Sequence, residues 1–386
     1  MSEYLPGLEG VPATKSNISD INGDKGKLYY RGYPIEQLAA HSTFEETCLL
    51  LLDGRLPTPQ ELASFDEQLR NNRRVKFNIR DLMKNIPPTG HPMEVLQTAV
   101  AALAVFYPGN ECLTSPDQCE DLDYVHNMTV KIIARMPVLV SMWEHIRNGY
   151  DPIEPRKDLS FAENFLYMLN GEVPDSTLAD IMDTCLILHA EHTINASTFA
   201  ALVAGSTLTS PYGVVAAAVG TLSGPLHGGA NEKVVNMLAE IESPRDVKKW
   251  LDKKLDNKEK IWGLGHREYK TKDPRATILQ GLVHKLVEQR GGEVSPKFEI
   301  AMALEAAAEE RLAEKGVYAN VDYYSGILYE EMGIPVDQFT TVFAISRAAG
   351  WLAHWREQLA DNRIFRPTQV YTGEPERDYV PLSKRG

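Results

Sequence analysis

The sequence is poor in cysteine, with four in 386 residues: Cys48, Cys112, Cys119 and Cys185. No two of them form a C-x-x-C pair, so they provide no framework for a metal site or a disulfide-rich fold. Long apolar runs are also missing, because no stretch approaches the ~18–20 continuous apolar residues that cross a bilayer. The opening MSEYLPGLEG lacks the basic and apolar regions of a secretory signal. We therefore expect a cytoplasmic protein with reduced thiols.

Basic residues are fewer than acidic ones, 40 against 53. The formal net charge is −13 at pH 7, and the isoelectric point is about 5.3. An acidic surface repels nucleic acid and anionic membranes, so neither is an expected partner. It would also repel an anionic substrate, which must therefore meet a local cluster of arginines. The arginine positions thus indicate where a substrate could bind.

Strand patterns are scarce after residue 35, and strands do not alternate with helices as a parallel sheet requires. The turns around Leu28-Tyr29-Tyr30 predict a small N-terminal β-hairpin. Capping boxes beginning at Ser42 and Ser160 predict helices that end at Gly54 and Gly171. Apolar residues at helical spacing predict further helices over 176–206, 231–241, 275–290, 297–315 and 337–360. The sequence therefore predicts a mostly all-α protein, and its length favours two domains.

A first cluster of chemically active residues runs from His189 to Ser197. His192 and Asn195 are three residues apart, so we expect them to share one face of a helix. Both side chains can hydrogen-bond a carboxylate or a keto oxygen. Two histidines in this cluster could also bind a metal, but no third ligand is evident. The alternative is a core histidine whose hydrogen bonds are satisfied inside the protein.

A second cluster centres on His227, which stands among glycines in SGPLHGGANE. The small neighbours leave room around the imidazole. A neutral ring here could donate a hydrogen bond to a carbonyl that gains negative charge. The alternative is an ordinary turn between two helices.

A third cluster contains Gly263, Gly265 and His266, followed by Asp273-Pro274-Arg275. The loop lacks the G-x-G-x-x-G spacing and a preceding strand, so the dinucleotide-binding fingerprint is absent. Asp273-Pro274 is typical of a helix start, which places Arg275 in the first turn. Backbone amides, a histidine, basic residues and a positive helix end together favour a bound anion.

A fourth cluster surrounds Asp322 with apolar and aromatic residues. Desolvation there would make the carboxylate more basic, as a general base for a weakly acidic C–H requires. The alternative is an aspartate that caps a helix beginning near Ser325. Arg347 follows in an apolar helix, where it needs an anion as partner, either a ligand carboxylate or an internal acid. Arg366 precedes Pro367 in a loop, and its alternative is simple surface solvation.

The order and spacing of these clusters resemble the citrate synthase family over almost the whole chain. The resemblance is strongest in PLHGGANE, GLGHREYKTKDPR, NVDYYSGILYEEMGIP and SRAAGWLAHWREQ. It implies a nearly all-α homodimer with a large domain, residues 1–222 and 329–386, and a small domain, residues 223–328. It also implies the condensation of acetyl-CoA with oxaloacetate and hydrolysis of citryl-CoA to citrate and CoA, without a metal or other cofactor.

The resemblance assigns roles to matched residues. Asp322 would remove a proton from the acetyl-CoA methyl group, His227 would stabilise the enol or enolate, and His266 would polarise the keto group and protonate the alkoxide. Oxaloacetate would be held by His192, Asn195, Arg275, Arg347 and, across the dimer interface, Arg366. CoA would be contacted by Leu264, Gly265 and Lys270.

One departure from the family concerns the neighbours of His192. The family often has Asp before this histidine and Glu after it, whereas this chain has Glu191 and Thr193. The hydrogen-bond partner that orients His192 is therefore left open by the sequence.

Two other functions share this resemblance. A 2-methylcitrate synthase would use propionyl-CoA with the same catalytic residues, although Asn320-Val-Asp322-Tyr-Tyr-Ser-Gly looks more like citrate synthases. A non-catalytic binding protein of the same fold is expected to have lost a catalytic residue, and none is missing. The extra N-terminal domain of NADH-inhibited hexameric forms is not found, so a dimer is the expected assembly.

Overall fold

The computed structural model describes residues 4–107, 121–374 and 376–385, which form sixteen α-helices and one small sheet. The strands are β1 (Ser19–Asn22), β2 (Lys27–Tyr30) and β3 (Tyr33–Pro34). The first helices are α1 (Ile35–His41), α2 (Phe44–Asp53), α3 (Pro59–Asn72), α4 (Phe77–Lys84), α5 (Pro92–Phe106), α6 (Leu122–Arg147), α7 (Phe161–Asn170) and α8 (Ser176–His189). The remaining helices are α9 (Ala196–Gly205), α10 (Pro211–Leu222), α11 (Ala230–Leu238), α12 (Val247–Asp256), α13 (Pro274–Gln289), α14 (Pro296–Leu312), α15 (Asp322–Glu331) and α16 (Phe339–Leu359).

The predicted N-terminal hairpin is confirmed and extended by a third strand. β1 and β2 are antiparallel, with Ser19 opposite Tyr30, and β3 continues the sheet on the other side of β2. Tyr30 is fully buried, and its hydroxyl donates to the carbonyl of Glu191 at 2.8 Å. The sheet thereby supports the segment that follows α8.

The helix ends follow the predicted signals with one correction. Ser160 and Glu163 form the predicted capping box of α7. At α2 the cap is Thr43, whose hydroxyl accepts the Glu46 N–H at 3.2 Å, so the prediction that placed the box at Ser42 is wrong by one residue. The Ser42 hydroxyl bonds to the carboxylate of Glu46 instead, at 2.7 Å.

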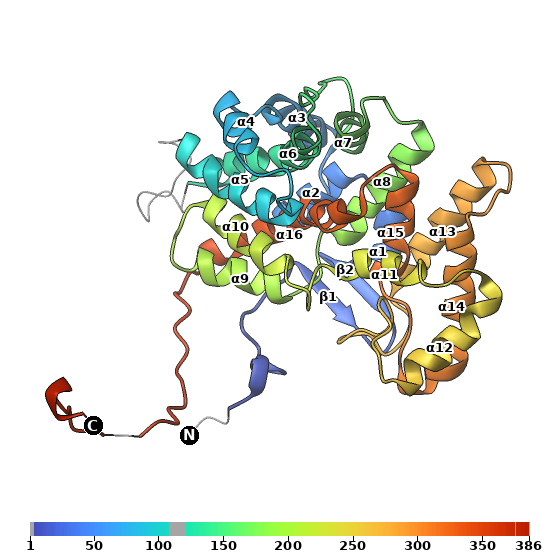
Figure 1. Cartoon of the computed structure of the whole chain (residues 1–386). Helices are drawn as coiled ribbons and strands as arrows, with labels where there is room; N and C mark the ends of the chain where they lie inside the picture. The colour runs from blue at the N-terminus through green and yellow to red at the C-terminus, as the bar shows by residue number, and fades with distance from the viewer. Residues whose placement is uncertain (1–3, 108–120, 375, 386) are drawn as a thin grey trace.

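Helix α16 forms the centre of the molecule (Figure 1). It packs against α2, α5, α6, α8, α9 and α10. Every residue from Phe339 to Trp355 is buried. A helix that is apolar on all sides is stable only inside a protein. The single arginine of its buried span, Arg347, therefore lies in the core.

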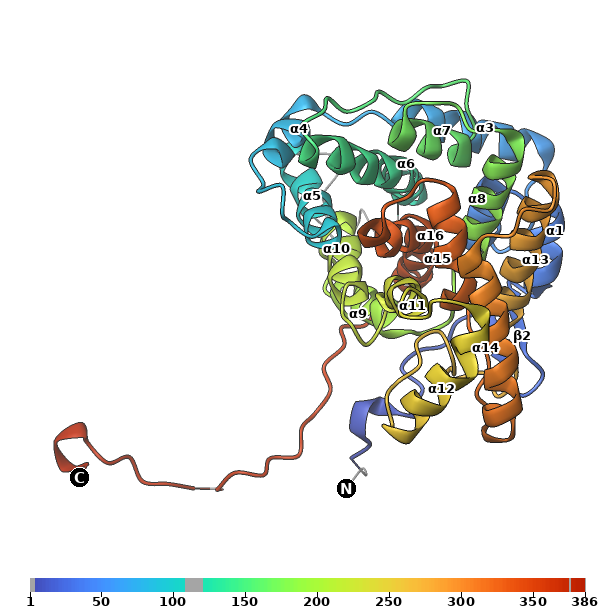
Figure 2. The same ribbon diagram turned by 45° about the vertical axis from the view of Figure 1, so that its right-hand side comes forward.

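Helices α11 to α15 lie together on one side of the molecule, as both ribbon views show (Figures 1 and 2). α15 packs against α11, α13 and α14, and α14 packs against α12. This group meets the rest of the chain where α11 touches α16 and where α13 touches α1 and α8. The C-terminal segment runs away from the body of the molecule (Figure 2), with Tyr371, Tyr379 and Leu382 exposed.

The thiols of Cys48 and Cys185 are free and buried; Cys112 and Cys119 lie outside the described residues. Within the described ranges, no helix has both the length and the apolar character that crossing a bilayer requires.

Candidate active site

The segment between α8 and α9 carries His192 on a turn. The prediction that His192 and Asn195 share a helix face is wrong, because α8 ends at His189 and Asn195 is the N-cap of α9. The Asn195 Oδ1 accepts the Thr198 N–H at 3.1 Å, and its Nδ2 lies 3.3 Å from the carbonyl oxygen of His192. Asparagine commonly begins a helix in this way, because its side-chain oxygen accepts a free N–H of the first turn. Asn195 thus shapes the turn that presents His192.

Thr193 within this turn has a φ of 51°. Positive φ is rare for a β-branched residue, because the side chain crowds its own backbone. The turn is held in this unusual form by several bonds, including one from the Thr193 N–H to the Ser19 hydroxyl at 3.1 Å.

His192 itself is buried, and its Nε2 lies 3.2 Å from the Tyr269 hydroxyl. Its ring centroid is 5.1 Å from that of His266. Burial lowers the pKa of His192 well below its usual value, and the nearby charges of Arg275 and Arg347 lower it further. The imidazole is therefore neutral at pH 7, and the two predicted histidines lie side by side.

His227 lies in the turn between α10 and α11, half-buried. Its Nε2 accepts the backbone N–H of Ser197 at 3.2 Å and lies 2.9 Å from the Ser197 hydroxyl. Burial, with a contribution from Arg347, lowers the pKa of His227 to about 4. An imidazole that accepts at one nitrogen carries its proton on the other. The proton of His227 is therefore on Nδ1.

Ser197 was not singled out from the sequence, yet it connects several residues of the site. Its hydroxyl bonds to the Asn195 Oδ1 at 2.8 Å and accepts the indole N–H of Trp351 at 3.1 Å. The bond between Ser197 and His227 spans 30 residues, so the local sequence gave no signal for it. Ser197 thereby links the His192 turn to the His227 turn.

The loop that contains Gly263 and Gly265 pairs with the segment before α15. The N–H of Gly265 donates to Tyr318 at 2.7 Å, and the N–H of Asn320 donates to Gly263 at 2.9 Å, both to carbonyl oxygens. The Asn320 side chain also donates to the carbonyl of Gly265, at 2.9 Å. At Gly263, φ is 77° and a Cβ atom would lie 2.7 Å from Val234, so only glycine fits. Leu264 and Gly265 are thus held in a strand-like bridge.

His266 follows this bridge and is half-buried. Its Nδ1 accepts the backbone N–H of Glu268 at 3.0 Å. Burial, with a contribution from Arg275, lowers the pKa of His266 to about 4. The neutral ring therefore carries its proton on Nε2. His266 and His227 thus present opposite ring nitrogens as donors.

Asp322 is the first residue of α15, so the helix begins three residues before the predicted Ser325. Its side chain caps nothing; the backbone N–H of Asp322 donates to Asn320 Oδ1 at 3.0 Å. The Asp322 Oδ1 is buried and has no hydrogen-bond partner among the described residues. Burial raises the pKa of this carboxyl to about 7, although Arg275 and Arg347 oppose the shift. The capping alternative is therefore wrong, and the carboxylate is unusually basic.

The two buried arginines differ in their partners. Arg275 forms a fork with Asp273, with Nε at 3.0 Å and the terminal nitrogen at 2.7 Å from the carboxylate oxygens. Burial disfavours the charge of Arg275, but Asp273 outweighs it and raises the pKa of the pair's guanidinium. Arg347 donates only from Nε, to the carbonyl of His189 at 2.6 Å, and has no acidic partner within 4.0 Å in the described chain. Burial lowers the pKa of Arg347 to about 10.

The histidines, Asp322 and the arginines influence one another's protonation, so the predicted clusters do converge. Residues 7–368 match the family model described as citrate synthase, C-terminal domain. The chain belongs to the citrate synthase family. It is accordingly an enzyme of the acyltransferase class, and the predicted family, fold class and function are confirmed.

The relatives cover the whole chain. A citrate synthase from Acidithiobacillus ferridurans is 59% identical over 382 residues, which are 99% of this chain and 98% of that protein. The crystal structure of citrate synthase from Pyrobaculum aerophilum has a TM-score of 0.91 at 40% identity and covers 98% of this chain and 95% of its own. Citrate synthase from Thermoplasma acidophilum, solved as a ternary complex with carboxymethyl coenzyme A and oxaloacetate, has a TM-score of 0.91 at 35% identity and covers 100% of both chains.

Two residues that the citrate synthase resemblance assigns to ligands lie apart from the buried cluster. Arg366 is exposed and donates to the carbonyl of its neighbour Pro367 at 2.8 Å. It lines a groove of about 730 Å³ with residues of α9, the end of α16 and the N-terminal segment. Lys270 is also exposed, at the end of the His266 segment. The single chain does not bring either residue to the histidines.

Glu191, one of the departures from the citrate synthase pattern, turns toward α16. Its Oε1 lies 3.0 Å from His354 Nε2 and accepts the Ser19 hydroxyl at 2.8 Å. Both side chains are buried. Glu191 therefore ties the first strand, the His192 turn and α16 together, and it does not orient the His192 ring.

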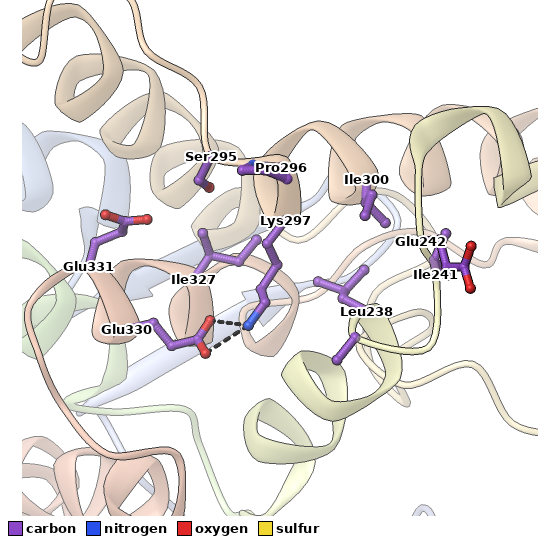
Figure 3. A pocket seen from close by; sticks show the side chains of 11 residues that line it. Leu238, Ile241, Glu242, Ser295, Pro296, Lys297, Ile300, Ile327, Glu330 and Glu331 are labelled. Atoms are coloured by element: carbon purple, nitrogen blue, oxygen red, sulfur yellow. Dashed lines mark hydrogen bonds and ion pairs between the residues drawn. The ribbon is translucent and has the colours of Figure 1, made fainter.

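A separate cavity of about 390 Å³ lies between α11, α14 and α15 (Figure 3). Lys297 reaches across it to Glu330 at 2.6 Å, and Leu238, Ile300 and Ile327 form apolar walls. None of the predicted site residues lines it. In the described ranges no three histidine, cysteine or acidic side chains are grouped as metal ligands would be.

Proposed function

We propose that this citrate synthase condenses acetyl-CoA with oxaloacetate through Asp322, His227 and His266, and hydrolyses the citryl-CoA that forms. The observation that carries the proposal is the combination of a basic, unpartnered carboxylate with neutral histidines whose ring protons point away from their own backbone partners. We further propose that the reaction takes place in the cytoplasm and feeds the tricarboxylic acid cycle.

Asp322 would take the proton from the acetyl methyl group. A thioester α-proton is a very weak acid, so a base for it must be poised near the working pH. The buried Oδ1 has no internal partner to compete for that proton, and the pKa of Asp322, raised by burial to about 7, suits the task. The carboxylate is ionised in part at neutral pH and regains a proton readily.

His227 would stabilise the enol or enolate that proton removal creates. With Nε2 occupied by Ser197, its Nδ1–H is left to donate to the thioester oxygen. A donor already in place where charge develops lowers the barrier without reorganisation. Because the pKa of His227 is lowered by burial to about 4, the ring acts as a neutral hydrogen-bond donor.

His266 would polarise the keto group of oxaloacetate and protonate the alkoxide after carbon–carbon bond formation. Its Nδ1 is held by Glu268, so Nε2–H is the donating atom. Because burial lowers the pKa of His266 to about 4, the ring is neutral at pH 7. The positive charges of the arginines would instead balance the negative charges of the dicarboxylate.

The carboxylates of oxaloacetate would bind His192, Arg275 and Arg347, with Asn195 setting the turn. Arg347 supports this best, because its buried charge lacks an internal anion. Arg275 already shares its charge with Asp273 and would extend its remaining donor to the ligand. We propose that Arg366 joins them from the neighbouring subunit of a homodimer, since its own subunit leaves it exposed and away from the site.

CoA would lie along Leu264 and Gly265, with the exposed Lys270 near its phosphates. We propose that residues 223–328 form a small domain that closes on a large domain, residues 1–222 and 329–386. Arg275 and His266 belong to the first unit, whereas His192 and Arg347 belong to the second. A ligand held by both units favours the closed state, so oxaloacetate would bind first and complete the CoA site.

Steady-state kinetics with oxaloacetate and either acetyl-CoA or propionyl-CoA test this function. We expect citrate as the product and a kcat/KM for acetyl-CoA at least about 10-fold above that for propionyl-CoA. The reaction should be unchanged after dialysis against EDTA, because N–H donors and guanidinium groups meet the developing charge. A preference for propionyl-CoA would instead identify a 2-methylcitrate synthase, and the absence of condensation with either would indicate a binding protein.

A further inference from the structure

We propose that Tyr269 is a positioning residue for His192: its hydroxyl holds Nε2 of the imidazole and leaves the ring proton on Nδ1, free for the dicarboxylate. The proposal rests on the proposed function, because it takes His192 as an oxaloacetate ligand. It answers the question that the sequence left open, namely what orients His192 when Glu191 and Thr193 replace the usual neighbours.

The contact is direct and enclosed. Tyr269 is only 1% exposed, and its hydroxyl oxygen lies 3.2 Å from His192 Nε2. The rings of Tyr269, His192 and His266 pack on one another, with Tyr269 centroid distances of 5.7 Å to His192 and 4.9 Å to His266. The hydroxyl has no other hydrogen-bond partner in the described chain. Ring packing therefore fixes the position of the Tyr269 hydroxyl, and this hydroxyl bonds to the His192 imidazole nitrogen.

The direction of the hydrogen bond follows from the two groups. Burial raises the pKa of Tyr269, so the phenol keeps its proton. Burial lowers the pKa of His192, so the imidazole is neutral and offers one acceptor nitrogen. The phenol donates to Nε2, and a neutral imidazole that accepts at Nε2 carries its proton on Nδ1. The only side-chain hydrogen bond of His192 in the described chain is the one at Nε2, so Nδ1 remains available to a ligand.

His192 differs from the other site histidines in what fixes it. The ring of His227 is held by a backbone N–H of α9, and the ring of His266 by the N–H two residues after it. His192 is held by a side chain 77 residues away in sequence. That side chain belongs to the segment that carries His266, which docks on the β1–β2 turn through the Lys270 N–H and the Gly23 carbonyl at 3.1 Å. His192 is therefore oriented only while this segment is in place.

Replacing Tyr269 with phenylalanine removes the hydroxyl and keeps the packed ring. In Tyr269→Phe we expect KM for oxaloacetate to rise about 10-fold, kcat to fall less than about 3-fold, and KM for acetyl-CoA at saturating oxaloacetate to stay within about 2-fold. A purely structural loss would move both KM values or the unfolding transition instead. The matched control is Tyr324→Phe, which removes another buried tyrosine hydroxyl, one bonded to Glu305 at 2.5 Å. Its KM for oxaloacetate should stay within about 2-fold of wild type.

A double-mutant cycle tests whether Tyr269 acts through His192. In a His192→Asn background, Tyr269→Phe should change KM for oxaloacetate by less than about 2-fold, because its partner is gone. An unchanged KM in the single variant, or a full 10-fold effect in the His192→Asn background, overturns the proposal. Both experiments are compared with the wild-type rate of citrate formation. If the wild-type protein formed no citrate, the proposed function would be wrong, and the comparison of variants would not bear on that question.

Nitrogen NMR gives a test whose readout comes from the wild-type protein, with a variant needed only to assign the signals. With histidine labelled by ¹⁵N, and the His192 signals assigned by their loss in His192→Asn, we expect a protonated Nδ1 and an unprotonated Nε2. A protonated Nε2 in the ligand-free enzyme overturns the assignment.

Discussion

The two arginines that would bind the dicarboxylate and the three groups that would act on the reacting atoms are built on different backbone. Arg347 lies within the buried helix α16 and Arg275 in the first turn of α13, both almost without exposure. His227, His266 and Asp322 lie in turns or at a helix start, and each is half-buried. The positive charges of the two arginines therefore lie in packed, buried surroundings, whereas His227, His266 and Asp322 each keep one accessible side. The comparison separates a rigid binding half from a half that must meet the reacting atoms.

The largest expected effect comes from breaking the proton-transfer half at Asp322. Asp322→Asn keeps the size of the side chain but removes the base, so kcat should fall at least about 100-fold. Calorimetric binding of oxaloacetate should stay within about 3-fold, because the arginines are untouched. The control is Asp252→Asn, a half-buried aspartate on α12 paired with Arg311. Turnover of Asp322→Asn near the wild-type rate would contradict its role as the base.

Substituting the two arginines separately tests whether each one serves binding or folding. Arg347→Leu should raise KM for oxaloacetate about 100-fold and KM for acetyl-CoA far less, because it removes the charge that awaits an anion. Its stability should change little, since no internal acid loses a partner. Arg275→Leu should instead destabilise the protein by about 3–5 kcal/mol, because Asp273 is left buried without its partner.

Both arginine variants are compared by steady-state kinetics and by urea unfolding. Equal increases in the two KM values for Arg347→Leu would show that Arg347 is structural. An Arg275→Leu variant as stable as wild type would mean that the fork with Asp273 contributes little to folding.

A smaller effect separates the two kinds of proton-transfer group by pH. The pKa of Asp322 is raised to about 7 by burial, so the base is lost as pH falls through that value. We expect kcat/KM for acetyl-CoA to fall about 10-fold for each pH unit below about 7 and to level off above it. The histidines add no step near neutrality, because the pKa values of His227 and His266 are lowered to about 4. A profile that is flat from about pH 5 to pH 8 would contradict the assignment to Asp322.

The sequence predicted the helical fold, and it indicated candidate site residues, because both leave local signals. Apolar spacing predicted α13, α14 and α16 within a few residues. The break at 190–195 was missed because no glycine or proline marks it and apolar residues continue on both sides. Its turn instead depends on Asn195 and on the positive φ of Thr193, neither of which is distinctive in a helical pattern.

Contacts between segments that are distant in the sequence could not be predicted, because no local pattern indicates them. Whether Arg347 has an internal acid depends on how α16 packs against the His192 turn, where Glu191 pairs with His354 instead. The bond between Tyr269 and His192 likewise arises only when two remote segments meet. A residue type can indicate that a partner is needed, but only the packed structure identifies it.

The pairing of Gly263–Gly265 with Tyr318–Asn320 has a consequence for how this enzyme can be recombined. The backbone bonds and the Asn320 amide fix the segment that carries His266 to the segment that carries Asp322. The spacing of acid and base is thus set as the chain folds and travels with these two segments as a unit. A chimera that takes both segments from one parent keeps their pairing intact. A crossover between the two segments would instead pair backbone from two different parents.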